Sequence, residues 1–216
     1  MRQLRHILVA LAATAGLAAC SGDATTSPAD ATPTPSFKVV VNHMAPDSTS
    51  ADFTVTQSGG TFQIGPHAIY FPPNSICDPA TSGYGVSLWD TPCSTLNRPV
   101  RIHAEVRNVG GLAFVDFSPE LRFAPTRNAN RWVWIWMRAP IDRSADSDSL
   151  KQTFNILWSP APGLPGIDES LTDPTLKTRV LSSEGLVYRR IKHFSGYQIS
   201  VGFKTDDADG LVPGLF

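Results

Sequence analysis

Short runs in which apolar and polar side chains alternate recur along most of this chain, and they constrain the fold more than any other feature. The clearest run is Pro99–Arg107, where four apolar residues beginning at Val100 alternate with four polar residues beginning at Arg101. A period of two places the two sets on opposite faces of a β-strand. The run therefore predicts a strand with one buried and one solvated face.

The other runs are equally short, and prolines and glycines separate them. Arg131–Arg138 is apolar on both faces, which is typical of a central strand. No run has the spacing of an amphipathic helix. The expected strands are Phe37–Asn42, Asp52–Thr56, Thr61–Ile64, His67–Phe71, Pro99–Arg107, Leu112–Phe117, Glu120–Phe123, Arg131–Arg138, Thr153–Trp158, Thr178–Leu181, Gly185–Ile191 and Gly196–Phe203. Short strands at this regular spacing predict an all-β chain folded as a single antiparallel β-sandwich domain.

The first 19 residues have the features of an export signal. Arg2 and Arg5 precede an apolar stretch, Ile7–Ala18, whose twelve residues fall short of the roughly 20 that a membrane-spanning helix needs. Leu17-Ala18-Ala19-Cys20 then resembles the lipobox of bacterial lipoproteins. We expect cleavage before Cys20 and lipidation of that cysteine, which gives stable membrane attachment. An ordinary signal peptide with an incidental cysteine is the alternative.

Residues 21–36 contain Ser, Thr, Pro, Ala, Asp and Gly, with no apolar side chain larger than alanine. Such a composition cannot bury enough surface to fold, so 20–36 is expected to be a lipidated tether. The folded domain is expected at 37–203 and a tail at 204–216. Ser21 resembles the sorting position of outer-membrane lipoproteins, and attachment to the cell membrane stays open. In either membrane the domain faces the periplasm or the exterior.

With Cys20 assigned to lipid, Cys77 and Cys93 are the two remaining cysteines. Exported domains lie where disulfides persist, so these two are expected to form one. The closed loop of about 15 residues stabilises the fold by about 3 kcal/mol in the chain-entropy model. A metal site that adds histidines is the alternative, but neither CxxC nor HxxxH spacing occurs, and no metal is expected.

The composition also limits the classes of partner and cofactor that we expect for this chain. The formal net charge is −1 and no basic run stands out, so no nucleic-acid partner is expected. No glycine-rich phosphate loop, GxSxG or HExxH occurs, and no cofactor is expected. Trp132, Trp134 and Trp136 share one face of an expected strand, where we predict that they form core. A sugar-binding platform is the alternative, and it requires two adjacent exposed rings.

Several segments of the chain resemble the ZU5 family. They are Gly59–Ile64, His67–Ile76 with its Pro-Pro turn, Asp116–Phe123 and the closing His193–Tyr197. ZU5 domains occur in ankyrins, netrin receptors and zonula occludens proteins, and ZU5-like single domains occur in bacterial lipoproteins. The resemblance covers roughly residues 58–203 and implies a β-sandwich. The segment from Cys77 to Cys93 departs from the family pattern and looks like an insertion.

Some ZU5-containing proteins cut themselves between the Phe and the Ser of a His-Phe-Ser triplet, which here is His193-Phe194-Ser195. Ser195 Oγ is placed to attack the Phe194 carbonyl through a five-membered ring, which gives an ester that water hydrolyses. His193 would take the hydroxyl proton and return it to the leaving nitrogen. Gly196 would allow strained dihedrals just after the scissile bond.

The triplet also has a purely structural interpretation. In a strand, His193 and Ser195 share a face and form a hydrogen bond without chemistry, and ankyrin ZU5 domains fold without cutting themselves. We therefore expect a non-catalytic interaction or structural module at the cell envelope. It is attached to the membrane by its lipid and contacts a protein or a surface polymer. Self-processing at Phe194–Ser195 is the first alternative, and a carbohydrate-binding module is the second.

Overall fold

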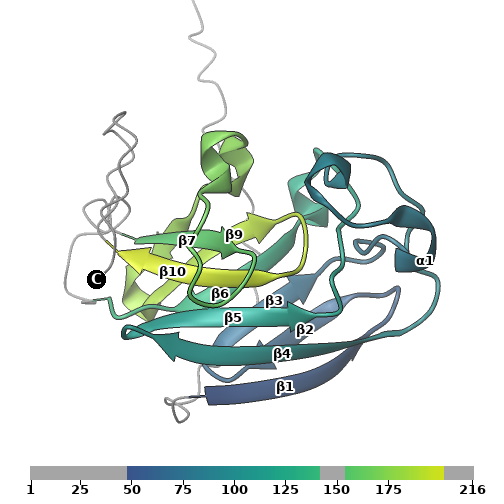
Figure 1. Cartoon of the computed structure of the whole chain (residues 1–216). Helices are drawn as coiled ribbons and strands as arrows, with labels where there is room; N and C mark the ends of the chain where they lie inside the picture. The colour runs from purple at the N-terminus through teal and green to yellow at the C-terminus, as the bar shows by residue number, and fades with distance from the viewer. Residues whose placement is uncertain (1–47, 142–153, 202–216) are drawn as a thin grey trace, which may run out of the picture. The chain divides into compact units, whose positions relative to one another are not determined.

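The computed structural model describes residues 48–141 and 154–201. They form two five-stranded antiparallel sheets packed face to face, which confirms the predicted β-sandwich (Figure 1). The first sheet has the order β1-β4-β5-β10-β7, and the second has the order β2-β3-β6-β9-β8. The strands are β1 (Ser48–Val55), β2 (Gly60–Ile64), β3 (His67–Phe71), β4 (Val100–Val109), β5 (Leu112–Ser118), β6 (Val133–Arg138), β7 (Phe154–Ser159), β8 (Arg179–Leu181), β9 (Leu186–Ile191) and β10 (Gly196–Val201).

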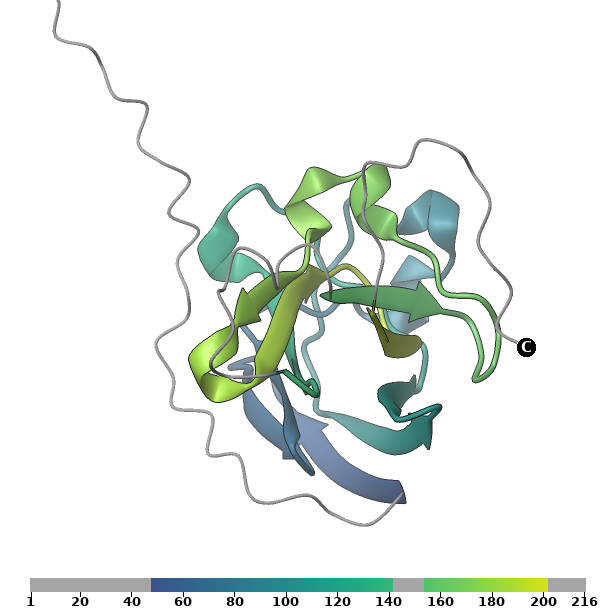
Figure 2. The ribbon, with the colours of Figure 1, turned by 90° about the vertical axis from the view of Figure 1, so that its left-hand side faces the viewer.

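The helical elements of the described residues are single turns, and several begin at an Asp or Asn whose side chain caps the turn. They are α1 (Pro79–Ser82), η1 (Val86–Leu88), η2 (Ala129–Arg131), η3 (Glu169–Leu171), η4 (Pro174–Leu176) and η5 (Ser182–Glu184). In Figure 1, α1 lies at the right-hand side of the sandwich, and Figure 2, turned by 90°, shows the short helical turns above and beside the strands. None of the described helices has the length and apolar composition needed to cross a membrane.

The alternation of side chains located the strands well. β3 has the predicted bounds, and β4 has the predicted faces, with Ile102 and Ala104 fully buried and Arg101 exposed. β6 lies at the centre of its sheet, as its apolar residues on both faces predicted. The expected signal peptide, lipidated Cys20 and its tether, the strand at Phe37–Asn42 and the tail at 204–216 lie outside the described residues.

The strand predicted at Glu120–Phe123 is wrong. This segment forms no ladder, because it divides its backbone hydrogen bonds between two neighbours. The Phe194 amide donates to the Leu121 carbonyl at 2.6 Å, and the Cys77 amide donates to the Arg122 carbonyl at 3.0 Å. The segment therefore joins the loop that begins at Cys77 to the connection between β9 and β10.

The main core lies between the sheets, where Ile102, Ile135 and Ile156 are fully buried. A second apolar cluster lies on the outer face of the second sheet, where Trp134 and Trp136 pack against Tyr188. β6 contributes to both clusters, because alternate side chains of a strand point to opposite faces. Its tryptophan face is therefore buried in core, as predicted.

The stability of the sandwich is expected to fall as the pH drops from 6.5 to about 4 because of His67. This side chain is 2 % exposed, and its Nδ1 accepts a hydrogen bond from the Arg138 amide at 3.0 Å. Burial, followed by the charge of Arg138, lowers the pKa of His67 from 6.5 to about 4. Between these pH values the unfolded chain therefore binds a proton at His67 that the folded chain does not bind. This difference lowers the free energy of unfolding by about 3 kcal/mol at pH 4.

Urea unfolding at pH 7.5 and at pH 4, in a Ser195→Ala background that keeps the chain intact, measures this loss. His67→Gln keeps an acceptor for the Arg138 amide and is expected to remove about 3 kcal/mol of the pH dependence. The matched control, His103→Gln, changes an exposed histidine of β4. Equal pH dependence with and without His67→Gln would contradict the prediction.

Candidate functional site

The triplet His193-Phe194-Ser195 lies where the chain crosses from one sheet to the other. β9 ends at Ile191 in the second sheet, and β10 begins at Gly196 in the first (Figure 1). Single hydrogen bonds hold the crossing. They include the one from the Phe194 amide and one from the Tyr197 hydroxyl to the His193 carbonyl at 2.7 Å. The triplet is therefore outside the regular ladders of both sheets.

Three side chains form a line through the imidazole of His193. Ser195 Oγ lies 3.4 Å from His193 Nδ1, and His193 Nε2 lies 3.0 Å from Glu169 Oε1. The exposed fractions are 7 % for Ser195, 0 % for His193 and 7 % for Glu169. A proton on Nε2 that is donated to Glu169 leaves Nδ1 free to accept the hydroxyl proton of Ser195. The order is that of a nucleophile, a base and an orienting carboxylate.

Glu169 reaches this site from η3, where the Asp168 carboxylate caps the turn by accepting from the Ser170 amide at 2.9 Å. Its second oxygen, Oε2, accepts from Arg189 Nη2 at 2.6 Å. Arg189 is fully buried in β9 and also donates to the Ile156 carbonyl at 2.7 Å. The buried cation therefore holds Glu169 in its ionised form beside His193.

Burial sets the protonation of the imidazole. It lowers the pKa of His193 against the opposing effect of Glu169, so the ring is neutral at pH 7. Burial also acts to raise the pKa of Glu169, but the hydrogen bond to His193 and the charge of Arg189 outweigh it, and the net shift is downward. A neutral imidazole next to a carboxylate is the state that a general base requires.

Tyr84 and Trp158 contact the two atoms that would react. The Tyr84 hydroxyl donates to the Phe194 carbonyl oxygen and lies 3.3 Å from His193 Nδ1. Trp158 Nε1 donates to Ser195 Oγ. Because Oγ accepts from Trp158 with a lone pair, the hydroxyl proton of Ser195 remains available for donation to His193 Nδ1.

The aromatic surroundings immobilise the triplet. The Phe194 ring is fully buried and stacks on Phe117 with a centroid distance of 4.4 Å. The His193 ring stacks on Trp89 at 3.6 Å. Both groups are thus held by packing as well as by hydrogen bonds, as a preorganised site requires.

Gly196 is needed for space and not for strained dihedrals, which corrects the expectation from the sequence. Its φ lies outside the positive range. A Cβ at this position would lie 2.3 Å from Phe114 Cζ and 2.7 Å from the Ser159 carbonyl oxygen. No side chain fits there, because real Cβ atoms do not approach other atoms so closely.

The predicted disulfide between Cys77 and Cys93 is present, with a Cα–Cα distance of 5.6 Å. It excludes these two cysteines as metal ligands. Within residues 48–141 and 154–201, no group of three His, Cys, Asp or Glu side chains is placed to hold a metal ion.

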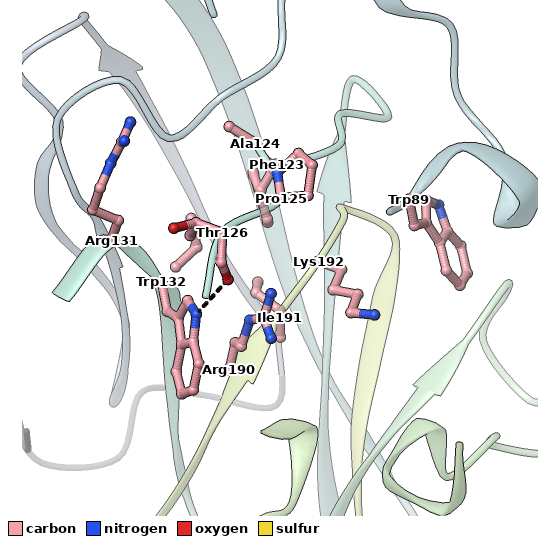
Figure 3. Close-up of a pocket in the computed structure, with 11 residues that line it drawn as sticks. Trp89, Phe123, Ala124, Pro125, Thr126, Arg131, Trp132, Arg190, Ile191 and Lys192 are labelled. Atoms are coloured by element: carbon pink, nitrogen blue, oxygen red, sulfur yellow. Dashed lines mark hydrogen bonds between the residues drawn. The ribbon is translucent and has the colours of Figure 1, made fainter. Parts of the chain in front are cut away.

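A small pocket lies next to the site and has a cationic lining (Figure 3). The Arg190 guanidinium lies 4.6 Å from the centroid of the Trp132 ring, and Trp132 Nε1 donates to the Thr126 carbonyl at 3.0 Å. Lys192 binds two carboxylates at 2.7 and 2.8 Å, those of Asp90 and Asp173. The charge of the pocket is therefore partly balanced within the protein, and we assign no ligand to it.

The tryptophan row does not meet the condition for a sugar platform. Trp134 and Trp136 are each 2 % exposed, and Trp132 is half-buried. Two adjacent exposed rings are therefore not present on this strand.

Sequence reasoning identified His193, Phe194 and Ser195 but missed Glu169 and Tyr84. These two lie 24 residues from His193 and 110 residues from Phe194. Neither lies in a strand, and no spacing or repeat marks them. The acidic cap of η3 was the one available signal, because Asp before a short turn is a common N-cap.

No protein-family model matches this chain, and the curated proteins and solved structures compared with it contain no match.

Proposed function

We propose that this domain cleaves its own Phe194–Ser195 bond by an N-to-O acyl shift. The observation that carries the proposal is the position of His193, which lies 3.4 Å from the Ser195 hydroxyl and 3.0 Å from the Glu169 carboxylate. Serine is a weak nucleophile, and an adjacent base oriented by a third group is the usual means of activating it.

The reaction begins when His193 Nδ1 takes the proton from Ser195 Oγ. Oγ bonds to the Phe194 carbonyl carbon, and the carbonyl oxygen becomes an oxyanion. The bond between this carbon and the Ser195 nitrogen then breaks, and His193 returns its proton to that nitrogen. The product is an ester between the Phe194 carbonyl and Ser195 Oγ, with a free amine on Ser195. Hydrolysis consumes one water and gives a carboxylate on Phe194 and a hydroxyl on Ser195.

The two products are expected to stay together after the cut. β10 follows the scissile bond directly and lies between β5 and β7 in the first sheet. It pairs with β7 from Gly196 to Val201, and its Tyr197 and Ile199 are buried in the core. Release of the C-terminal piece would therefore expose core side chains and break a ladder on each side of β10.

We also propose that the chain is an exported lipoprotein, lipidated on Cys20 and attached to the cell membrane or the outer membrane. The disulfide between Cys77 and Cys93 supports export, because such bonds persist outside the cytoplasm. The two-sheet fold is in keeping with a ZU5-like domain, which the segments from Gly59 to Ile76 and the closing triplet suggest. A non-catalytic contact with a protein or surface polymer is a second candidate role. The exported, disulfide-bonded domain could fill this role both before and after cleavage.

The test is denaturing mass spectrometry of the full chain, expressed with export and incubated at pH 7.5. Wild type is expected to give a fragment of 22 residues, Ser195 to Phe216. Ser195→Ala is expected to give none, because no nucleophile remains. The matched control is Ser200→Ala, which removes a hydroxyl from β10 away from the bond and leaves cleavage unchanged.

Hydroxylamine separates the acyl shift from attack by an outside protease. It attacks an ester and leaves a hydroxamate on the Phe194 carboxyl carbon, which changes the mass of the N-terminal piece. An intact wild-type chain, or fragmentation that persists in Ser195→Ala, would contradict the proposal.

A further inference from the structure

We propose that Tyr84 is a catalytic residue of this self-cleavage: its hydroxyl stabilises the oxyanion that forms on the Phe194 carbonyl oxygen. The loop closed by the disulfide between Cys77 and Cys93 supplies this residue, and Arg122 positions the loop. The inference rests on the proposed function. It assigns a role to the loop between Cys77 and Cys93, which takes no part in the reaction of the His-Phe-Ser triplet itself.

The contact is made with the atom where charge develops. The Tyr84 hydroxyl donates to the Phe194 carbonyl oxygen in the uncleaved chain, and the attack by Ser195 turns that oxygen into an oxyanion. A donor already aimed at this position needs no reorganisation during the reaction. The hydrogen bond strengthens as the charge grows, and so it favours the transition state over the ground state.

Tyr84 keeps its proton at neutral pH. Burial is the main reason that the pKa of its hydroxyl is raised to about 12. A hydrogen bond with Ser195 acts in the opposite direction, and Glu120 and Glu169 add smaller upward effects. The hydroxyl is therefore a donor and not a base, which leaves proton removal from Ser195 to His193. The two residues have separate roles although they lie 3.3 Å apart.

The loop around Tyr84 folds over a single buried guanidinium. Arg122 is 3 % exposed, and its nitrogens donate to four loop carbonyls. The acceptors are Ser82 at 3.1 Å, Gly83 at 3.3 Å, Leu88 at 2.9 Å and Thr91 at 2.6 Å. Arg122 also forms a backbone bridge with His193. One residue therefore fastens the loop that carries Tyr84 while its backbone adjoins the reacting triplet.

The loop has a second contact with the site, which also depends on its closed form. Trp89 is 8 % exposed, and its ring stacks on the His193 ring at 3.6 Å. The disulfide closes the segment that bears both Tyr84 and Trp89. Opening the disulfide is therefore expected to loosen the oxyanion donor and the base together.

The test follows cleavage of the full chain from the moment of its synthesis in a cell-free system with an oxidising glutathione buffer. Samples taken with time are denatured and analysed by mass spectrometry. Tyr84→Phe removes one hydroxyl and is expected to slow cleavage by about 10²–10³-fold, the usual effect of removing an oxyanion donor. The matched control is Tyr188→Phe, in the outer cluster of the second sheet, which is expected to cleave at the wild-type rate. Dithiothreitol is expected to slow wild type by a larger factor than Tyr84→Phe, because in the variant only the contact between Trp89 and His193 is left to be loosened.

Arg122→Lys tests the positioning role, because lysine keeps the charge but lacks the fork of donors. It is expected to slow wild type by a larger factor than Tyr84→Phe, since part of its effect is exerted through Tyr84. Effects that multiply would contradict the positioning role. Cleavage of Tyr84→Phe at the wild-type rate would overturn the inference and leave the proposed function standing. An uncleaved wild-type chain would instead contradict the proposed function itself.

Discussion

Glu169→Gln is expected to slow the proposed cleavage at Phe194–Ser195 by on the order of 10⁴-fold, the effect of replacing the orienting acid of a serine triad by its amide. The carboxylate of Glu169 accepts from His193 Nε2 at 3.0 Å and so keeps the free lone pair on Nδ1. An amide nitrogen at this position would donate to Nε2 and move the ring proton to Nδ1. The imidazole would then be unable to accept the proton of Ser195.

The same change is expected to lower the free energy of unfolding by about 3–5 kcal/mol, the usual cost of removing one partner of a buried ion pair. Arg189 is fully buried, and Glu169 Oε2 is its carboxylate partner at 2.6 Å. Neutral glutamine leaves this cation without a counter-charge in a site that water does not reach. Loss of stability and loss of rate thus have separate physical causes in one residue.

Urea unfolding of Glu169→Gln in the Ser195→Ala background measures the stability, because the chain stays intact there. The rate is measured separately, with Ser195 present. The matched control is Glu184→Gln, which changes an exposed glutamate and is expected to alter neither quantity. Wild-type cleavage in Glu169→Gln would contradict the assignment of Glu169 as the orienting carboxylate.

Phe194→Ala is expected to destabilise the domain by about 3–5 kcal/mol, the range for removing a large buried aromatic ring. The ring is fully buried. It stacks on Phe117 at 4.4 Å and meets Phe71 and Phe123 edge-on at 5.6 and 5.1 Å. The cavity left by alanine would lie at the centre of this cluster, where the two sheets prevent collapse.

In the proposed reaction Ser195 attacks the backbone carbonyl, so the side chain of Phe194 is not itself a reacting group. Phe194→Leu fills most of the same space and is expected to remain folded and to cleave. Urea unfolding in the Ser195→Ala background gives the stability, with Phe53→Ala as the control at a half-buried ring. A loss for Phe194→Ala no larger than that for Phe53→Ala would show that the ring is not part of the core framework.

Much of the fold was determined by local sequence. The side-chain alternation predicted β4 and its faces, and the apolar residues on both faces of β6 predicted its central place. Both features report how many faces of a strand are buried, and this information is contained within six to ten consecutive residues. The disulfide between Cys77 and Cys93 followed in the same way from counting cysteines.

The segment Glu120–Phe123 shows where local pattern fails. Its apolar residues predicted a strand, and Leu121 and Phe123 are indeed buried. Its backbone, however, bonds with two different segments, so no ladder forms. The burial of a segment can be predicted from its own side chains. The pairing of its backbone depends instead on which segments of the rest of the chain lie next to it.

In the candidate site, too, some residues could be predicted from local sequence and others only from the tertiary structure. The sequence determined the proposed nucleophile and base, because Ser195 and His193 stand next to Phe194 in the chain. Only the tertiary structure decided that Glu169 would orient the base and that Tyr84 would meet the carbonyl. An isolated acid or phenol in a loop has no periodicity to read. Its partner is set by the path of the loop over the packed sheets, which is a property of the whole fold.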